Sequence, residues 1–279
     1  MPWRAQLKLD YTQEAGRTVA RFAHEGPLRI LQSLYPEGGA VCHNVLVHPP
    51  GGLVGGDTLS IQVSAAGNSH GLITTPGATR FYKSDGEQAL QDTHITLRNE
   101  ARLEWLPLET LCHSGCVGEN RLRIDLAPQA EFIGWDVISL GLPHAKAPFE
   151  RGRFLQHIEV PGVWLERGRI DALDARLLNS ALGMAGNSCV ASLFFVTGSK
   201  IHRARKQQAL DVARALVDAH ELPELGISAG VTSPNGQVVI VRVLAPLVEP
   251  AMQLLKAVWA TWRAELWGMA PATPRIWST

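Results

Sequence analysis

The sequence predicts a mainly-β protein of stacked or wrapped antiparallel sheets, with a small C-terminal α/β appendage that contains two helices. Two observations carry this prediction. Polar and apolar residues alternate through much of the first two-thirds of the 279-residue chain, a pattern typical of strands with one buried face. Apolar residues at helical spacing are confined to the last third.

The strands of the expected body are marked by alternation and by turn residues. Residues 4–11, 58–65 and 121–126 place apolar side chains at every second position. Glycine and proline stand between such segments, for example at Pro76-Gly77, and mark turns. Many short strands separated by turns are typical of layered or wrapped antiparallel sheets.

The last third of the chain has a different pattern. Residues 188–197 form an apolar run typical of a buried strand. Residues 203–221 have helical spacing, and a hairpin with a Pro-Asn-Gly turn is predicted over residues 226–244. A second helix is predicted from Pro250, because proline suits the first helical turn.

These patterns predict two regions that pack as one cooperative unit. Residues 1–185 form the β-sheet body, and residues 186–279 form a strand–helix–hairpin–helix region. The chain is long enough for one large domain, or for a domain with a smaller appendage.

The charge balance excludes some classes of partner. The chain has 26 basic and 26 acidic side chains and a formal net charge of zero. Nucleic acids and anionic membranes both favour a basic excess, so neither is expected as a partner. The first residues lack the apolar core of a secretory signal, and four cysteines are few for this length. We expect a cytoplasmic protein with reduced thiols.

A glycine-rich segment covers residues 48–57, HPPGGLVGGD. Its spacing is close to that of a phosphate-binding P-loop, but Asp57 stands where such a loop needs lysine. A carboxylate at this position would repel phosphate. A tight turn at a corner of a sheet, with glycines at positive φ, is the expected role.

Cys112, His113 and Cys116 form the best local candidate for a metal site. Thiolate and imidazole are good ligands for zinc, nickel or copper. A closed site needs a fourth ligand, which the spacing does not supply. Two buried thiols and a loop histidine are the alternative interpretation. Elsewhere the sequence shows no catalytic constellation, and we expect no enzyme.

Acidic residues also occur in or beside predicted strands, at Glu104, Glu109 and Glu166. Carboxylates at such positions are usually solvated. A carboxylate on the inner face of a sheet, however, could attract a cation.

Several sequence strings occur in order along nearly the whole chain. They are residues 3–9, Gly26-Pro27-Leu28, Tyr35-Pro36-Glu37, Cys42-His43, residues 48–57, residues 74–84 (TTPGATRFYKS), residues 103–109 (LEWLPLE), Leu165-Glu166-Arg167 and Pro274-Arg275-Ile276-Trp277. In this order and spacing the strings resemble the urease accessory protein UreD (UreH) family.

The resemblance implies a β-helix-like stack of sheets with two helices and no enzymatic activity. It implies a urease maturation factor that binds urease apoprotein and a UreF-like helical accessory protein. Through the assembly it would work with a UreG-like GTPase to deliver nickel to the urease active site. No tightly bound cofactor is implied, only nickel in transit.

The resemblance also suggests site residues. Nickel is expected to pass through an interior tunnel, which makes acidic residues in the matching strings candidate transit ligands: Asp57, Glu104, Glu109 and Glu166. Other residues of the strings are expected to form the motif surface or to face partners: His48, Pro49, Gly51, Gly52, Gly55, Gly56, Thr75, Pro76, Gly77, Lys83 and Trp105.

Two other functions stay open at the level of sequence. One is an autonomous metal carrier that uses Cys112, His113 and Cys116. The other is an enzyme that binds an anionic substrate at the glycine-rich loop.

Overall fold

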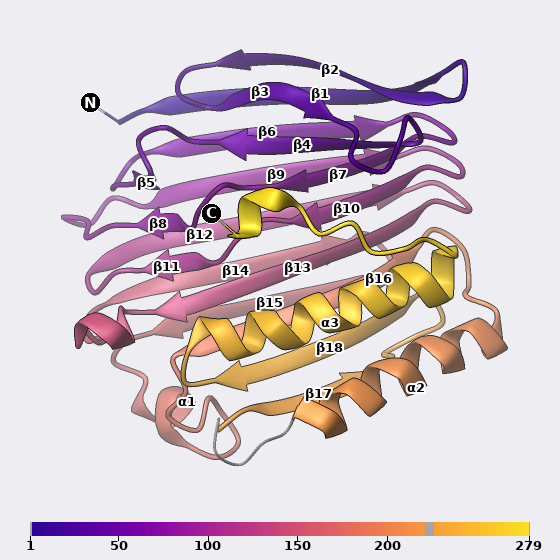
Figure 1. Cartoon of the computed structure of the whole chain (residues 1–279). Coiled ribbons are helices and arrows are strands. Elements are labelled where there is room, and N and C mark those ends of the chain that lie inside the picture. Colours follow the sequence, from indigo (N-terminus) through magenta and orange to yellow (C-terminus); the bar gives the residue numbers. More distant parts are fainter. Residues whose placement is uncertain (1, 221–225, 279) are drawn as a thin grey trace.

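Two β-sheets stack face to face, and helices cover the outer face of one of them (Figure 1). This computed structural model describes residues 2–220 and 226–278. Sheet A has seven strands, in the spatial order β15 (Trp164–Asp171), β14 (Gly152–Val160), β12 (Cys116–Leu126), β9 (Ala89–Leu97), β6 (Thr58–Ala65), β1 (Arg4–Glu14) and β2 (Arg17–Glu25).

Sheet B has eleven strands. Eight of them lie in the order β17 (Ser228–Thr232), β18 (Val238–Ala245), β16 (Cys189–Thr197), β13 (Glu131–Leu140), β10 (Arg102–Leu106), β7 (His70–Thr74), β4 (Val41–Val47) and β3 (Arg29–Leu34). The other three are the short strands β5 (Gly52–Leu53), β8 (Thr79–Phe81) and β11 (Thr110–Cys112).

The central strands of both sheets are parallel. In sheet A they are β1, β6, β9, β12 and β14, and in sheet B they are β4, β7, β10 and β13. The chain alternates between the sheets and returns to each in the same direction. The mainly-β, β-helix-like architecture is confirmed, but antiparallel pairing is restricted to the ends of the stack. Alternation shows which face of a strand is buried and carries no information on strand direction.

The inter-sheet core follows from the alternation. Strand β1 buries Ala5, Leu7, Leu9 and Tyr11 against sheet B, whereas the side chains between them face the opposite side and are exposed or partly exposed. Burial of one such leucine contributes about 1.5–3 kcal/mol. The expected strands over residues 4–11, 58–65 and 121–126 are therefore confirmed by β1, β6 and β12.

A second core lies between sheet B and the helices. Helix α2 (Arg203–His220) and helix α3 (Val248–Trp267) pack on the outer face of sheet B (Figure 1). The apolar stripe of α3 includes Trp259 and Trp262, as its spacing predicts. Helix α3 begins two residues before Pro250 and ends at Trp267, where it is capped by Gly268 with a φ of 65°. The predicted end of α2 at residue 221 lies outside the described residues.

The 3₁₀ turn near the C-terminus packs against sheet B. The indole of Trp277 packs against Trp135 and Trp259. Its Nε1 donates a hydrogen bond to Thr74 Oγ1 at 2.7 Å. The 3₁₀ turn Arg275–Ser278 that carries Trp277 thereby lies over the helix-covered face of the sheet (Figure 1).

Sheet B runs through the expected boundary at residues 185 and 186. Strand β13 pairs with β16, which pairs with β18, so the C-terminal strands extend the same sheet. Short connections at this end of the stack include α1 (Ala175–Asn179) and a 3₁₀ turn, Pro143–Ala145. Whether the two regions fold as one cooperative unit stays a prediction. In the described part of the chain no helix is long and apolar enough to span a membrane.

Sheet B contains a gap. Strands β4, β7 and β10 end and, after short loops, β5, β8 and β11 begin. Strand β13 pairs with β10 through residues 131–134 and with β11 through residues 138–140. Residues 135–137 therefore border the interruption.

Candidate functional site

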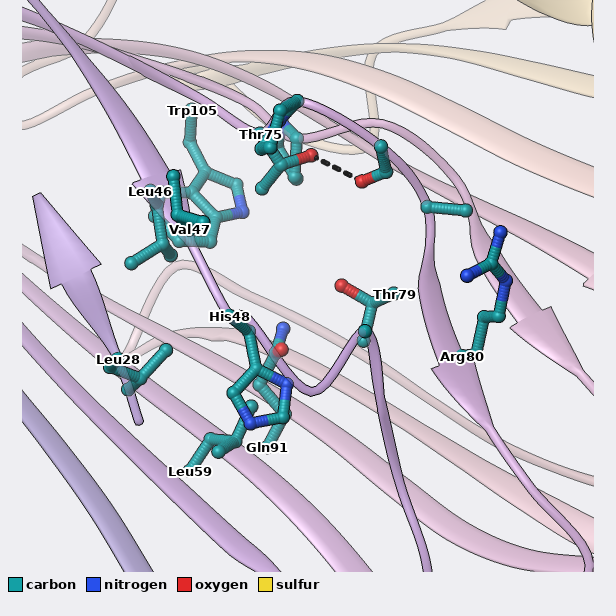
Figure 2. Close-up of a pocket in the computed structure, with 15 residues that line it drawn as sticks. Leu28, Leu46, Val47, His48, Leu59, Thr75, Thr79, Arg80, Gln91 and Trp105 are labelled. Carbon is teal, nitrogen blue, oxygen red and sulfur yellow. Dashed lines mark hydrogen bonds between the residues drawn. The ribbon is translucent and has the colours of Figure 1, made fainter. Parts of the chain in front are cut away.

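A cavity of about 220 Å³ lies at the gap in sheet B (Figure 2). Its wall is built from the loops that interrupt the strands and from residues of sheet A. The lining residues are Leu28, Leu46, Val47, His48, Gly51, Leu59, Thr75, Pro76, Gly77, Ala78, Thr79, Arg80, Gln91, Trp105 and Pro107. Because Leu59 and Gln91 belong to sheet A, the cavity reaches across the space between the sheets.

The mouth of the cavity combines polar groups with an apolar wall. Figure 2 shows the His48 imidazole beside Gln91, with the Thr79 hydroxyl facing the same space. Burial lowers the pKa of His48, and the nearby Asp57 opposes this effect. A neutral imidazole can accept or donate a hydrogen bond and can bind a metal ion.

The glycine-rich loop forms a turn in which several backbone N–H groups are already bonded. The Asp57 carboxylate accepts hydrogen bonds from the backbone N–H of Trp3, at 2.7 Å, and of Val54, at 2.9 Å. The N–H groups of Gly51, Gly56 and Asp57 bond to backbone carbonyls. These donors are not available to cradle phosphate. Gly56 has a φ of 88°, consistent with the predicted turn.

A chain of polar side chains leads from the cavity into the space between the sheets. Gln91 Nε2 donates to Asn120 Oδ1 at 3.3 Å, and Asn120 Nδ2 donates to Asp136 Oδ1 at 2.8 Å. Gln156 Nε2 donates to the other carboxylate oxygen of Asp136 at 2.5 Å. We call Gln91, Asn120, Asp136 and Gln156 the polar row. It crosses a core built mainly from apolar side chains.

Asp136 is the charged centre of the polar row. It lies on the section of β13 that borders the gap and has the same orientation as the inward-facing Phe132 and Ile138. Burial raises the pKa of Asp136 to about 6, and the negative charge of Glu166 acts in the same direction. A buried carboxylate with a perturbed pKa beside a cavity is a candidate functional group.

The polar row continues toward the edge of the stack at Glu166. Glu166 on β15 pairs across the strands with Ile158, which belongs to the inter-sheet core. Its carboxylate forms an ion pair with the Arg242 guanidinium of β18. The ion pair thus lies on the side of the polar row away from the cavity, near enough for the charge of Glu166 to act on Asp136.

Glu104 lies on the opposite face of sheet B from the polar row. It is fully buried under α3, and its carboxylate bonds to His70 Nε2 at 2.8 Å and Trp259 Nε1 at 2.6 Å. The Nε of Arg263 lies 3.6 Å away and compensates its charge. Strand alternation places Leu103 and Trp105 inward, so Glu104 must face the helices.

The four acids proposed as transit ligands therefore lie in different places. Asp57 closes the glycine-rich turn, and Glu104 is covered by α3. Glu109 lies half-buried in the loop before β11, and its charge acts on Cys189 in the helix-covered core. Of these four, Glu166 is the one beside the polar row.

Cys112 and Cys116 point into the inter-sheet core, whereas His113 packs on Tyr82, with ring centroids 4.8 Å apart. Burial and the adjacent Cys116 raise the pKa of Cys112, and a hydrogen bond from Cys112 lowers that of Cys116. Within residues 2–220 and 226–278, no group of three or more His, Cys, Asp or Glu side chains is arranged to hold a metal ion.

Six of the residues expected to form the motif surface meet at the cavity: His48, Gly51, Thr75, Pro76, Gly77 and Trp105. Strings far apart in the sequence therefore build one site. Of the others, Lys83 lies beside Gly115.

Sequence reasoning missed the polar row. Asp136 lies between Gly134 and Ile138 in an apolar strand, and strand alternation places its side chain on the face that packs into the inter-sheet core. Asn120 has the same parity as Leu122 and Ile124. A polar residue at a core-facing position was the signal available in the sequence.

Fold and site define a two-layer β protein with helices on one face and a polar path through its interior. The model of the UreD urease accessory protein family matches residues 4–278. The chain is 67% identical to the urease accessory protein UreD of Variovorax paradoxus (strain S110) and 66% identical to that of Polaromonas sp. (strain JS666 / ATCC BAA-500). Identity to the UreD protein of Leptothrix cholodnii (strain ATCC 51168 / LMG 8142 / SP-6) is 50%. Each alignment covers 100% of both chains. The chain belongs to the UreD family of urease accessory proteins.

Proposed function

We propose that this protein is a non-enzymatic urease maturation factor, which binds urease apoprotein and helps deliver nickel to its active site. Membership in a family of urease accessory proteins supports the role in maturation. The single structural observation that supports nickel delivery is the polar row. Asp136 is a buried carboxylate retained at a cost in stability, and it lies between a cavity and the edge of the stack that carries Glu166.

The path starts at the cavity. Here the His48 imidazole and the oxygens of Thr79 and Gln91 offer weak ligands to a hydrated cation. Several weak sites along a path suit transit better than one tight site, because the cation must be able to leave each site again.

Asp136 is the proposed anionic site in the middle of the path. Two amide groups orient its carboxylate. With a pKa of about 6 the carboxyl group is mainly ionised at neutral pH. The row thus places a negative charge in a core that would otherwise repel an ion.

Glu166 is the next acid along the path. Its carboxylate is close enough to affect the pKa of Asp136, and its side chain is 21% exposed. Of the four proposed transit acids, we retain Glu166 for this role and add Asp136. We assign Asp57 and Glu104 to the turn and to the contact with α3.

The outer surfaces would hold the partners. We propose that the chain works in an assembly with urease, a UreF-like helical accessory protein and, through it, a UreG-like GTPase, in the cytoplasm. The two ends of the path lie at the gap in sheet B and at the edge formed by β15, so docked partners could receive the cation without its release to solvent.

The test is the nickel content of urease in cells that carry the urease genes, with and without the gene for this chain. We expect urease without nickel to accumulate when this chain is missing, and excess nickel to restore activity only in part. Equal nickel content in both strains would refute the proposal. In that case the cavity should be screened for anionic ligands.

A further inference from the structure

The edge of the stack beyond the polar row is open. Across sheet A, Asn120 pairs with Gln156 and Gln156 with Gly168 of the edge strand β15. Across sheet B, Ser192 pairs with Arg242 and Arg242 with Gly230 of the edge strand β17. In each sheet, the row of paired residues that runs outward from the polar row therefore ends at a glycine of the edge strand.

Neither glycine closes the edge. A Cβ atom at Gly168 or Gly230 would meet no atom of the described residues within 4 Å. Two charged side chains, Glu166 and Arg242, occupy inward-facing positions of their strands near this opening.

Arg242 forms an ion pair with Glu166, whose carboxylate is the proposed ligand of the cation in transit. Its guanidinium pairs with Glu166, while 48% of the Arg242 side chain is exposed to solvent. Half-exposed ion pairs of this kind are weak because water screens their charges, so this pair can open readily. When it opens, the Arg242 head group can move into water at little cost because its stem is flexible.

The charges balance better with a cation than with Arg242. Ionised Asp136 and Glu166 carry two negative charges, and Arg242 supplies one positive charge. A divalent cation between the two carboxylates would neutralise both, and Arg242 would then be redundant. Coulomb interaction with two carboxylates in a half-buried site favours the doubly charged ion.

We infer that Arg242 is a counter-ion latch, which pairs with Glu166 in the empty protein and is displaced from it by a divalent cation leaving the polar row. This inference rests on the proposed function, because it assumes that the row carries a cation. It adds that the edge between β15 and β17 is the controlled end of the path.

The latch predicts opposite effects for its two residues. Arg242→Gln removes the competitor and should tighten Ni²⁺ binding, whereas Glu166→Gln removes the ligand and should weaken it. Arg242→Lys keeps the charge and should bind Ni²⁺ as the wild type does. From the free energy of a half-exposed ion pair we expect a change of about two- to fivefold for Arg242→Gln.

The experiment measures Ni²⁺ binding by equilibrium dialysis to the purified assembly of this chain with its accessory partners, without urease. Arg214→Gln is the matched control, since Arg214 is 50% exposed and lies on α2 away from the row. Tighter binding by Arg242→Gln together with weaker binding by Glu166→Gln supports the latch. Unchanged or weaker binding by Arg242→Gln overturns it.

A parallel measurement separates the latch from the proposed function. The same assemblies are mixed with urease apoprotein and Ni²⁺, and urease-bound nickel is counted. If the wild-type assembly fails to load urease, the proposed function itself fails. If loading depends on the chain and on Glu166 while Arg242→Gln binds Ni²⁺ like the wild type, only the latch is refuted.

Discussion

The guanidinium of Arg263 is fully buried and lies with Nη2 2.5 Å from Oε2 of Glu37. This contact joins α3 to the turn between β3 and β4. Glu37 also bonds to His43 at 2.6 Å, and Glu104 approaches the Nε of Arg263 from β10. A small buried charge network thus holds the last long helix on sheet B.

Arg263→Met should destabilise the protein strongly. The substitution leaves the fully buried Glu104 and the partly buried Glu37 without their shared cation. Loss of one partner of a buried ion pair costs about 3–5 kcal/mol. Urea denaturation would measure the change in the free energy of unfolding. Arg214→Gln, on exposed α2 surface, should change it by less than about 0.5 kcal/mol. A loss for Arg263→Met as small as that of the control would show that the network does not hold α3.

Asp136 should make stability fall as pH rises. Its folded-state pKa of about 6 lies above the ordinary value of 3.8, so its contribution is fully present below 3.8 and is lost as pH rises to about 6. Asp136→Asn lacks this dependence. Between pH 4 and pH 7 the free energy of unfolding of the variant should gain up to about 3 kcal/mol relative to wild type.

The pH series needs unfolding curves of both proteins at four or five pH values. The amide at residue 136 loses one hydrogen bond at every pH, which adds a constant offset and leaves the slope unaffected. The exposed Asp211→Asn serves as control. Parallel curves for wild type and Asp136→Asn would mean that the carboxyl of Asp136 has an ordinary pKa.

Gly52 of β5 and Gly77 of the cavity wall should respond differently to alanine. A Cβ atom at Gly52 would lie 2.4 Å from the Tyr82 ring and 2.8 Å from the Arg80 carbonyl oxygen. Overpacking of this kind costs about 1–3 kcal/mol. A Cβ atom at Gly77 would meet no described atom within 4 Å. Thermal unfolding of Gly52→Ala and Gly77→Ala would compare them, and equal melting temperatures would contradict the close approach of β5 to β8.

Replacement of both Cys112 and Cys116 by alanine should leave Ni²⁺ binding unchanged. The thiols face the inter-sheet core, and His113 packs on Tyr82 instead of joining them. Equilibrium dialysis of the accessory assembly would measure the bound Ni²⁺ in both proteins. Loss of one equivalent of nickel in the folded double variant would restore the alternative of an autonomous metal carrier.

The sequence predicted the architecture better than the site. Alternation located β1, β6 and β12, and helical spacing located α2 and α3, because these patterns depend on burial alone. Strand direction depends on how the chain returns to a sheet, which no local pattern encodes.

The motif strings located the cavity but not the charged path behind it. His48, Thr75 and Trp105 meet at the gap because three interrupted strands lie side by side. Glu104 was expected in the interior tunnel because it belongs to a matching string. Strand alternation instead places its side chain on the face of sheet B that α3 covers. Asp136 and Arg242 lie outside those strings, and their relation to Glu166 depends on pairing between distant strands.

The most direct test of nickel delivery through the polar row is the nickel content of urease activated in cells that express Asp136→Asn in place of the wild-type chain. Co-purification first confirms that the variant still assembles with its partners. We predict that urease-bound nickel then falls at least about tenfold, while Asp211→Asn gives the wild-type value. Wild-type nickel content with Asp136→Asn in an intact assembly would contradict transit through the polar row.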